Sequence, residues 1–213
     1  MTSSGRLFSL FPSLLMSLVL GCCIWAGVSG SILPLFLVPL VVYGLPPILF
    51  RVHQRRFPIR LGATRLLGER YVAWWSAHQL QLVFIAIPQL EALLRLVPGL
   101  YSAWLRCWGA KIGRSVYWTP LVEISDRSLV VIGDGVVIGH RAGIYGHIIR
   151  PTRDNMMLYC KPVVIGAGAF IGAAAVIGPG ARVHENAFIE AAARVHPNEE
   201  VREKKRTDAE WSP

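Results

Sequence analysis

The feature that most constrains this chain is a repeat with a period of six residues in its second half. Aliphatic side chains return at every sixth position, at Ile165, Ile171, Ile177, Val183, Ile189 and Val195. A small residue follows four positions after most of them, at Ala169, Ala175, Ala181, Ala187 and Ala193. In such a repeat each hexad forms one short strand and one corner, and three hexads complete a triangular coil. The pattern therefore predicts a parallel β-helix whose interior is filled by the aliphatic residues.

The same phase extends towards the N-terminus, beyond the most regular part of the repeat. It runs through residues 132–144, and a looser version starts at Ile112. Counting hexads predicts roughly four coils, in a domain over residues 109–197 that is followed by a polar tail over residues 198–213. A long alanine-rich helix is excluded, because a period of 3.6 residues is absent and glycine and proline interrupt the segment.

One interruption breaks the period between Ile144 and Ile165, where residues 150–164 exceed the repeat. The inserted loop begins shortly after Gly146 and His147. Long loops in compact folds are often functional, because ordering them is costly without a task. We therefore expect a substrate-binding loop, with the polar and aromatic candidates Arg150, Arg153, Asn155 and Tyr159.

The first part of the chain has a different character, since it lacks charge altogether over a long stretch. Residues 7–50 contain no Asp, Glu, Lys, Arg or His, and only 16% of all residues in the chain are charged. That stretch is long enough for two crossings of a hydrocarbon layer about 30 Å thick. We predict a transmembrane helical hairpin over residues 1–50, with helices near 7–27 and 32–50, the second kinked by its prolines. A secretory signal over residues 6–22 is the alternative.

Arginines cluster directly after this hairpin, and they predict its orientation. They are Arg51, Arg55, Arg56, Arg60, Arg65 and Arg70. By the positive-inside rule, the chain from residue 51 onward lies in the cytoplasm, at a bacterial-type inner membrane. The formal net charge of +9 is explained by contact with anionic lipid, so we expect no nucleic-acid partner.

Residues 51–108 form the predicted link between the hairpin and the repeat. Short apolar runs separated by polar residues, Pro88 and Pro98 are typical of amphipathic helices that lie at the membrane interface. An ordinary helical subdomain packed on the rest of the protein is the alternative. The four cysteines show no metal-ligand spacing, and free thiols are expected in a cytoplasmic protein.

The repeat also resembles a known family. Gly146-His147, the stretch KPVVIG over residues 161–166 and FIGAAAVIGPG over residues 170–180 are similar to the hexapeptide-repeat acyltransferases. Within these, the chain is most similar to bacterial O-acetyltransferases that modify sugars and related acceptors. The resemblance implies a left-handed β-helix, so the expected fold is α + β, with the helical hairpin and the amphipathic helices preceding that β-helix. It also implies a homotrimer with active sites between subunits.

The resemblance further implies roles for particular residues. His147 takes the place of the catalytic histidine, and the coenzyme-binding turns correspond to Gly172, Ala173, Ala175, Pro179 and Gly180. The co-substrate is acetyl-CoA, another acyl-CoA or an acyl carrier protein, with no permanently bound cofactor. In the sugar acetyltransferases the histidine is commonly followed by Asp, whereas Ile148 follows here. The partner that orients the imidazole is therefore open, with His140 and Asp154 as candidates.

The chemistry required of His147 can be stated without the family. Acyl transfer from a thioester to a hydroxyl or amine needs a base near pH 7, and a neutral imidazole suits that role. We expect an acyltransferase with a lipid-linked or amphipathic acceptor. Two alternatives stay open, a non-catalytic trimeric membrane scaffold and a metal-dependent enzyme similar to carbonic anhydrases. The spacing of His140 and His147 does not match the ligand pattern of the latter, so no metal site is predicted.

Overall fold

The structure is a computed structural model that describes residues 3–68 and 70–205. It divides into two compact units, one of Met1–Arg60 with Leu66–Val83 and the other of Leu61–Arg65 with Phe84–Pro213. The first contains the apolar helices, and the second contains the repeat.

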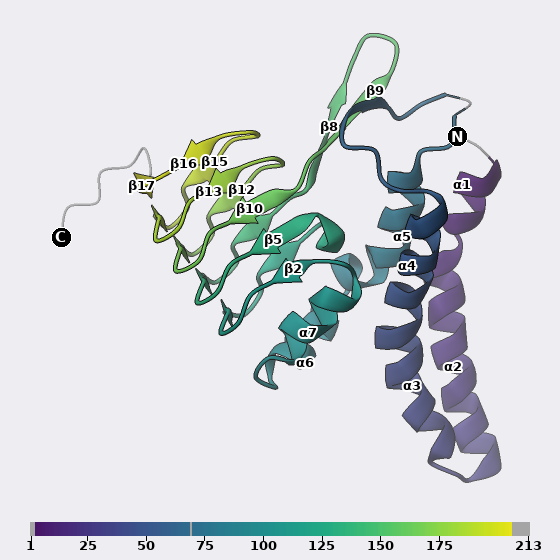
Figure 1. Ribbon diagram of the computed structural model, residues 1–213. Helices are drawn as coiled ribbons and strands as arrows, with labels where there is room; N and C mark the ends of the chain where they lie inside the picture. The colour runs from purple at the N-terminus through teal and green to yellow at the C-terminus, as the bar shows by residue number, and fades with distance from the viewer. Residues whose placement is uncertain (1–2, 69, 206–213) are drawn as a thin grey trace. The chain divides into compact units, whose positions relative to one another are not determined.

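The first unit contains two long helical segments joined by a tight turn (Figure 1), together with most of α5 (Ala73–Ala86). The first segment comprises α1 (Ser3–Phe8) and α2 (Phe11–Ser29), and the second comprises η1 (Leu33–Phe36), α3 (Leu37–Pro39), η2 (Leu40–Gly44) and α4 (Leu45–Arg56). Changes between 3-10, α and π geometry in the second segment occur around Pro34 and Pro39, as expected where proline removes a backbone donor. Gly30 ends α2 with φ of 65°, which glycine adopts without strain.

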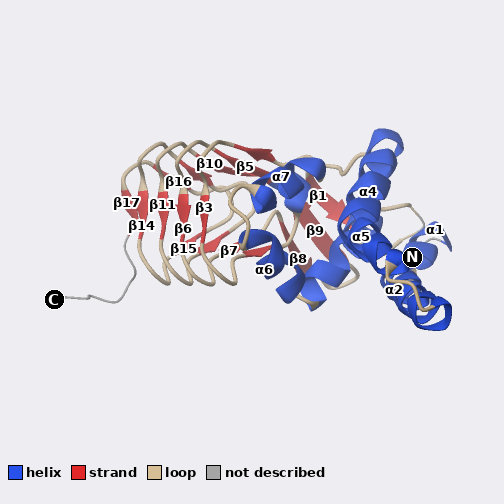
Figure 2. Cartoon of the chain, turned by 90° about the horizontal axis from the view of Figure 1, so that it is seen from below, coloured by secondary structure: helices blue, strands red, loops and turns tan. Residues whose placement is uncertain are grey.

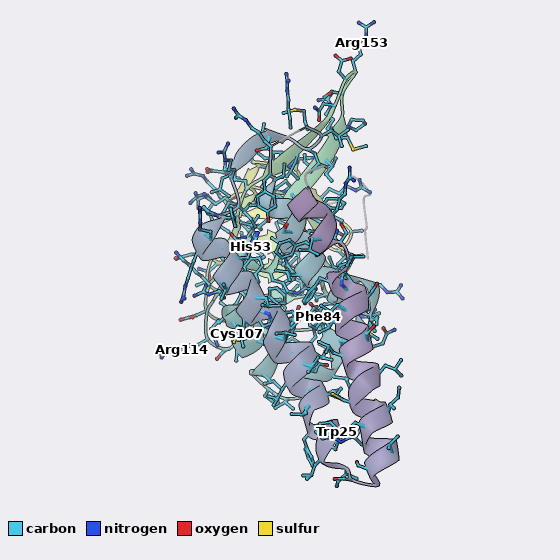
Figure 3. All side chains as sticks on the ribbon, turned by 90° about the vertical axis from the view of Figure 1, so that its right-hand side faces the viewer. Trp25, His53, Phe84, Cys107, Arg114 and Arg153 are labelled. Atoms are coloured by element: carbon cyan, nitrogen blue, oxygen red, sulfur yellow. The ribbon has the colours of Figure 1, made fainter. Side chains whose placement is uncertain are left out.

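Both segments are long and apolar enough to cross a membrane, over Gly5–Ser29 and Leu33–Arg56. On α2 only Phe11 and Leu15 are buried, whereas Ile24 and Trp25 are 56% and 57% exposed. Trp25 is labelled in Figure 3. Such a helix, apolar on every side but scarcely buried, is typical of a segment whose solvent is lipid.

The second unit contains the predicted parallel β-helix, built from three parallel sheets (Figure 2). One sheet contains β2 (Lys111–Ile112), β5 (Val130–Ile132), β10 (Val163–Ile165), β13 (Arg182–Val183) and β16 (Glu200–Val201). The next contains β3 (Tyr117–Trp118), β6 (Val137–Ile138), β11 (Phe170–Ile171), β14 (Phe188–Ile189) and β17 (Lys204–Lys205). The third contains β4 (Glu123–Ile124), β7 (Gly143–Ile144), β12 (Val176–Ile177) and β15 (Arg194–Val195). These strands complete four coils, and their arrangement fits the left-handed form that the resemblance implies.

The period of six sets the register between coils. Ile165 pairs with Val183, Ile171 with Ile189 and Ile177 with Val195, and these side chains are at most 1–2% exposed. Tight corners depend on small residues, because a Cβ at Gly172 would lie 2.4 Å from the backbone nitrogen of Ala191. The stack continues past the predicted boundary at residue 197, since β16 and β17 add two strands and Val201 fills the interior at 6% exposure.

The interruption of the repeat is an ordered ribbon rather than a loop. Strands β8 (His147–Pro151) and β9 (Met156–Cys160) form an antiparallel hairpin that leaves the coil stack (Figure 1). A third strand, β1 (Gly62–Arg65), pairs with β9. The sequence reasoning missed β1, because four residues in a basic segment carry too little hydrophobic pattern to predict a strand.

Three helices precede the first coil, α5 (Ala73–Ala86), α6 (Gln89–Arg95) and α7 (Leu100–Cys107), and a 3-10 turn, η3 (Arg127–Leu129), follows β4. Tyr101, Trp104 and Trp108 are buried, so α7 packs as an ordinary helix of a folded domain. Near the corner between α6 and α7, by contrast, Leu93 and Leu96 are 57% and 77% exposed. Contact of this corner with a membrane interface stays a prediction.

Candidate active site at one edge of the β-helix

His147 is the first residue of β8, immediately after the corner that follows β7. Its Nδ1 lies 2.6 Å from Oδ2 of Asp126, and the side chains of His147 and Asp126 are 16% and 1% exposed. A charge-assisted hydrogen bond of this length, with the carboxylate buried, fixes the orientation of the imidazole ring. The histidine thus combines a rigid position with access from outside the triangular prism that the coils form.

Asp126 itself is held from two directions. Ser125 donates through Oγ to the same Asp126 Oδ2 at 2.6 Å, and the backbone N–H of Leu129 donates to the Asp126 carbonyl at 2.9 Å. Gly146 permits the close approach, because a Cβ there would lie 2.8 Å from Cβ of Leu129 and 3.0 Å from Cβ of Asp126. Close packing against Leu129 and Asp126 therefore explains why glycine precedes His147.

The sequence reasoning missed Asp126 as the partner of His147. The two residues are 21 positions apart, whereas the coil between them spans 20 residues in the strand register, two more than three hexads. Three hexads before His147 is Leu129, so the period of six alone does not point to Asp126. Only the path of the backbone brings the carboxylate to the ring.

The two candidates named from sequence lie elsewhere. Asp154 belongs to the turn beyond the pair of Pro151 and Met156, whereas His147 pairs with Cys160 at the opposite end of the ribbon. Four residue steps along a strand span roughly 13 Å, so the Asp154 carboxylate does not reach the imidazole. The expectation that Asp154 orients His147 is corrected to Asp126.

His140 lies at a different corner of the prism, between β6 and β7, and its side chain is exposed. Its backbone carbonyl accepts a hydrogen bond from the N–H of Ala174 at 2.7 Å. Within one chain, His140 therefore adjoins the predicted coenzyme-binding turn rather than His147.

The five predicted coenzyme-binding residues are also divided between corners. Gly172, Ala173 and Ala175 lie between β11 and β12, and Pro179 and Gly180 lie between β12 and β13. Ala173 is exposed, whereas Ala175 is fully buried inside the prism. Ala175 can therefore contribute packing or backbone groups to a ligand site, but not its side chain.

The predicted substrate residues lie along the ribbon. Arg150 on β8 and Arg65 on β1 both pair with Met157, which lies on the strand between them. Arg153 lies at the tip of the β8–β9 hairpin (Figure 3). Asn155 stabilises the turn, because its Oδ1 accepts a hydrogen bond from the N–H of Met156 at 2.8 Å.

Tyr159 connects the ribbon to a later coil. Its hydroxyl donates to Oδ1 of Asn198 at 2.8 Å, and Nζ of Lys161 donates to the same oxygen at 2.7 Å. Asn198 lies at the corner after β15, in the coil beyond Gly180. Lys161 is a polar residue of this edge that the sequence reasoning did not single out.

Cys160 pairs with His147 in the ribbon, but its thiol is not ionised. The side chain is fully buried, and burial, followed by the nearby charge of Asp126, raises the pKa of the Cys160 thiol to about 12. A neutral thiol is a poor nucleophile. Cys160 therefore packs next to the His147–Asp126 pair (the dyad) and is not a candidate for forming a covalent intermediate.

No group of three or more His, Cys, Asp or Glu side chains that could hold a metal ion is found within residues 3–68 and 70–205.

Comparisons with known proteins give structural neighbours only. No family model matches the chain, and no curated protein matches it. A hexapeptide-repeat acetyltransferase of Vibrio cholerae O1 biovar eltor, solved with acetyl coenzyme A, is 18% identical, with a TM-score of 0.43 over 61% of this chain and 86% of that one.

Two further solved structures show a similar degree of likeness. A maltose O-acetyltransferase from Clostridium difficile 630 is 14% identical, with a TM-score of 0.39 over 55% of this chain and 75% of that one. A galactoside acetyltransferase in complex with coenzyme A is 20% identical, with a TM-score of 0.38 over 52% of this chain and 72% of that one.

Proposed function

We propose that this chain is a membrane-anchored acyltransferase that moves an acyl group, in the simplest case acetyl, from acyl-CoA to a hydroxyl or amine. The observation that carries the proposal is the 2.6 Å contact between His147 and the buried Asp126 at an edge of the β-helix. A histidine oriented by a buried carboxylate is the arrangement that general-base catalysis requires.

The contact with Asp126 assigns the protons on the imidazole. An ionised carboxylate only accepts hydrogen bonds, so Nδ1 of His147 carries the proton and Nε2 is the basic nitrogen. In the proposed reaction Nε2 removes the proton of the acceptor as its oxygen or nitrogen attacks the thioester carbonyl carbon. The carbon–sulfur bond then breaks, and the imidazolium returns the proton to the leaving thiolate. The products are an acylated acceptor and a free thiol.

Transfer in this scheme is direct, without an acyl-enzyme. Cys160 is the cysteine beside the dyad, and its thiol stays neutral because burial raises its pKa. Backbone N–H groups at the glycine-rich corners are the proposed donors to the tetrahedral oxyanion.

The position of the predicted coenzyme residues supports a site made by two subunits. His147 lies at the corner after β7, whereas Gly172 and Ala173 lie at the corner after β11. A groove that uses both corners needs two copies of the prism. The outer face of one sheet offers a surface for such contact, since Tyr117 is 63% exposed and the exposed rings of Phe170 and Phe188 stack at 4.9 Å. We propose a homotrimer, as the family resemblance implies.

The acceptor is proposed to be lipid-linked or amphipathic. Two helical segments have the length and composition of membrane spans, and the arginines that follow them support a catalytic unit on the cytoplasmic side of an inner membrane. The exposed aliphatic residues Leu93, Leu96 and Val97 suit contact with the membrane interface. The donor is acetyl-CoA, a longer acyl-CoA or an acyl carrier protein.

The first test is the variant His147→Ala in the full chain reconstituted in lipid nanodiscs. We expect acyl transfer, measured as release of the free CoA thiol, to fall about 10²–10⁴-fold, while the protein keeps its oligomeric state. The matched control is His184→Ala, since His184 is an exposed histidine paired with Glu200. Retained turnover in the His147 variant contradicts the proposal, and absence of any acyl-CoA binding by the native chain favours the scaffold alternative.

The acceptor requires a separate experiment in cells. Lipids and glycans from cells with and without the protein are compared by mass spectrometry, and the expected difference is one missing acyl mass. Restoration by the native chain, but not by the His147→Ala variant, links that mass to the dyad.

A further inference from the structure

Directly after Asp126 comes a buried arginine that the proposed chemistry does not use. Arg127 is 1% exposed, and its Nε donates to Oε1 of Glu91 at 2.8 Å, with Nη2 contacting the same oxygen. The second oxygen of Glu91 accepts from Nη2 of Arg95 at 2.9 Å and from the hydroxyl of Tyr101 at 2.8 Å. One buried carboxylate on α6 thus accepts hydrogen bonds from two arginines and a tyrosine.

Aromatic rings fix the same arginine from the other side. The guanidinium carbon of Arg127 lies 5.4, 5.6 and 5.8 Å from the ring centroids of Phe84, Trp104 and Trp108. Cation–π attraction is strongest where water is excluded, as it is here. A buried charge with this many specific contacts has little freedom to move without losing them.

The helices hold the chain on both sides of Asp126. Besides the contact of Arg127, Arg95 donates through Nη2 to the backbone carbonyl of Val122 at 2.8 Å. Val122 and Arg127 flank the irregular stretch that carries Ser125 and Asp126, where the six-residue repeat is broken. The position of this stretch is therefore set by side chains of α6 and α7, in addition to the hydrogen bonds between coils.

We infer that Glu91 and Arg127 are positioning residues for the Asp126–His147 pair. They hold the backbone at residue 126 so that Oδ2 stays within hydrogen-bond distance of Nδ1 of His147. The inference rests on the proposed function and extends it to a buried ion cluster formed by Glu91, Arg95 and Arg127. Catalytic groups are sensitive to such support, because a displacement of 1 Å can cost about 100-fold in rate.

The test is a double-mutant cycle of Arg127→Lys with Asp126→Asn, in the full chain in nanodiscs. In the native background Arg127→Lys keeps the positive charge but loses the planar guanidinium group and its several N–H donors. We expect kcat to fall about 10- to 100-fold, and KM for acetyl-CoA to change by less than about twofold. In the Asp126→Asn background the same change should have less than about a twofold effect, because Arg127 acts through Asp126. An equal fall in both backgrounds overturns the inference.

Two controls separate positioning from general damage to the fold. Arg182→Lys changes an exposed arginine of the same unit and is expected to leave kcat unchanged. If Arg127→Lys does not fold, Arg127→Gln takes its place, because it removes one cation and leaves Glu91 paired with the buried Arg95. The cycle with Asp126→Asn is then repeated with that variant.

A second readout does not depend on activity. Carbethoxylation of His147 by diethyl pyrocarbonate, followed by mass spectrometry, reports how the ring is held. Arg127→Lys should increase the rate to the same extent as Asp126→Asn, and an unchanged rate overturns the inference. If the native chain transfers no acyl group, the proposed function fails, whereas this modification still tests whether Arg127 positions the pair.

Discussion

At the scale of single residues, the edge site depends on how closely two backbone segments approach. Asp126 and His147 meet because Gly146 has no Cβ to collide with Leu129 and Asp126. The same crowding buries Cys160 opposite His147 and excludes water from its thiol. One close contact therefore produces a well-oriented base and an unreactive cysteine side by side.

The state of Cys160 gives a prediction about pH and reactivity. Burial raises its pKa from about 9.0 to about 12, so the thiol loses its proton only at a higher pH than an ordinary thiol does. At pH 8 its thiolate fraction is about one in ten thousand. We expect iodoacetamide to alkylate Cys160 at least about a hundredfold more slowly than the exposed Cys107, as measured by peptide mass spectrometry. Comparable rates would show that the thiol is ionised or open to solvent.

At the scale of elements, each strand of the β-helix separates an interior side chain from an exterior one. On β12 Ile177 is fully buried, whereas its neighbour Val176 is partly exposed on the outer face. The ribbon of β8 and β9 follows the same rule, because Leu158 and Cys160 are buried while their neighbours Met157 and Tyr159 are not. The alternation explains why the aliphatic repeat marks the core even though the strands are only two or three residues long.

This alternation predicts unequal effects of two neighbouring substitutions. Ile177→Ala should lower the free energy of unfolding by about 2–5 kcal/mol, since it removes buried methyl groups and leaves a cavity. Val176→Thr on the same strand should change it by less than about 1 kcal/mol, because its side chain lies on the outer face. Denaturant unfolding followed by circular dichroism measures both values. Equal losses for the two variants would contradict the assigned interior.

At the scale of the whole molecule, the groups assigned to the reaction do not share one corner of the prism. His147 and Gly180 follow the third sheet, whereas Ala173 and His140 lie between the second and the third. The proposed homotrimer would bring these corners together from different copies and cover the exposed aromatic face.

Association can be tested at that aromatic face. Phe188→Glu places a charge at a ring that is 40% exposed and stacked on Phe170. We expect the trimer to dissociate and acyl transfer to be lost although Asp126 and His147 are unchanged, because a charge is costly to bury in an apolar interface. Mass photometry of the nanodisc-bound protein measures the oligomeric state, with Arg202→Gln as the exposed control. A trimer that persists with full activity would exclude this face as the interface.

The sequence by itself determined the parts of this protein that depend on local periodicity. The hexad repeat predicted the parallel β-helix and its interior, and the charge-free stretch predicted two helical segments of spanning length, as Ile171, Ile177 and the segment Gly5–Ser29 show. These features follow from spacing along the chain, because side-chain direction in a coil or a helix is set by nearby residues.

Only the tertiary structure decided which groups meet. The pairing of His147 with Asp126, the addition of β1 to the ribbon and the ion cluster of Glu91 and Arg127 all join residues at least 21 positions apart. Such contacts are set by how the chain closes each coil and where it departs from the repeat. The coil between β4 and β7 is two residues longer than three hexads, so the period of six alone does not bring Asp126 to His147.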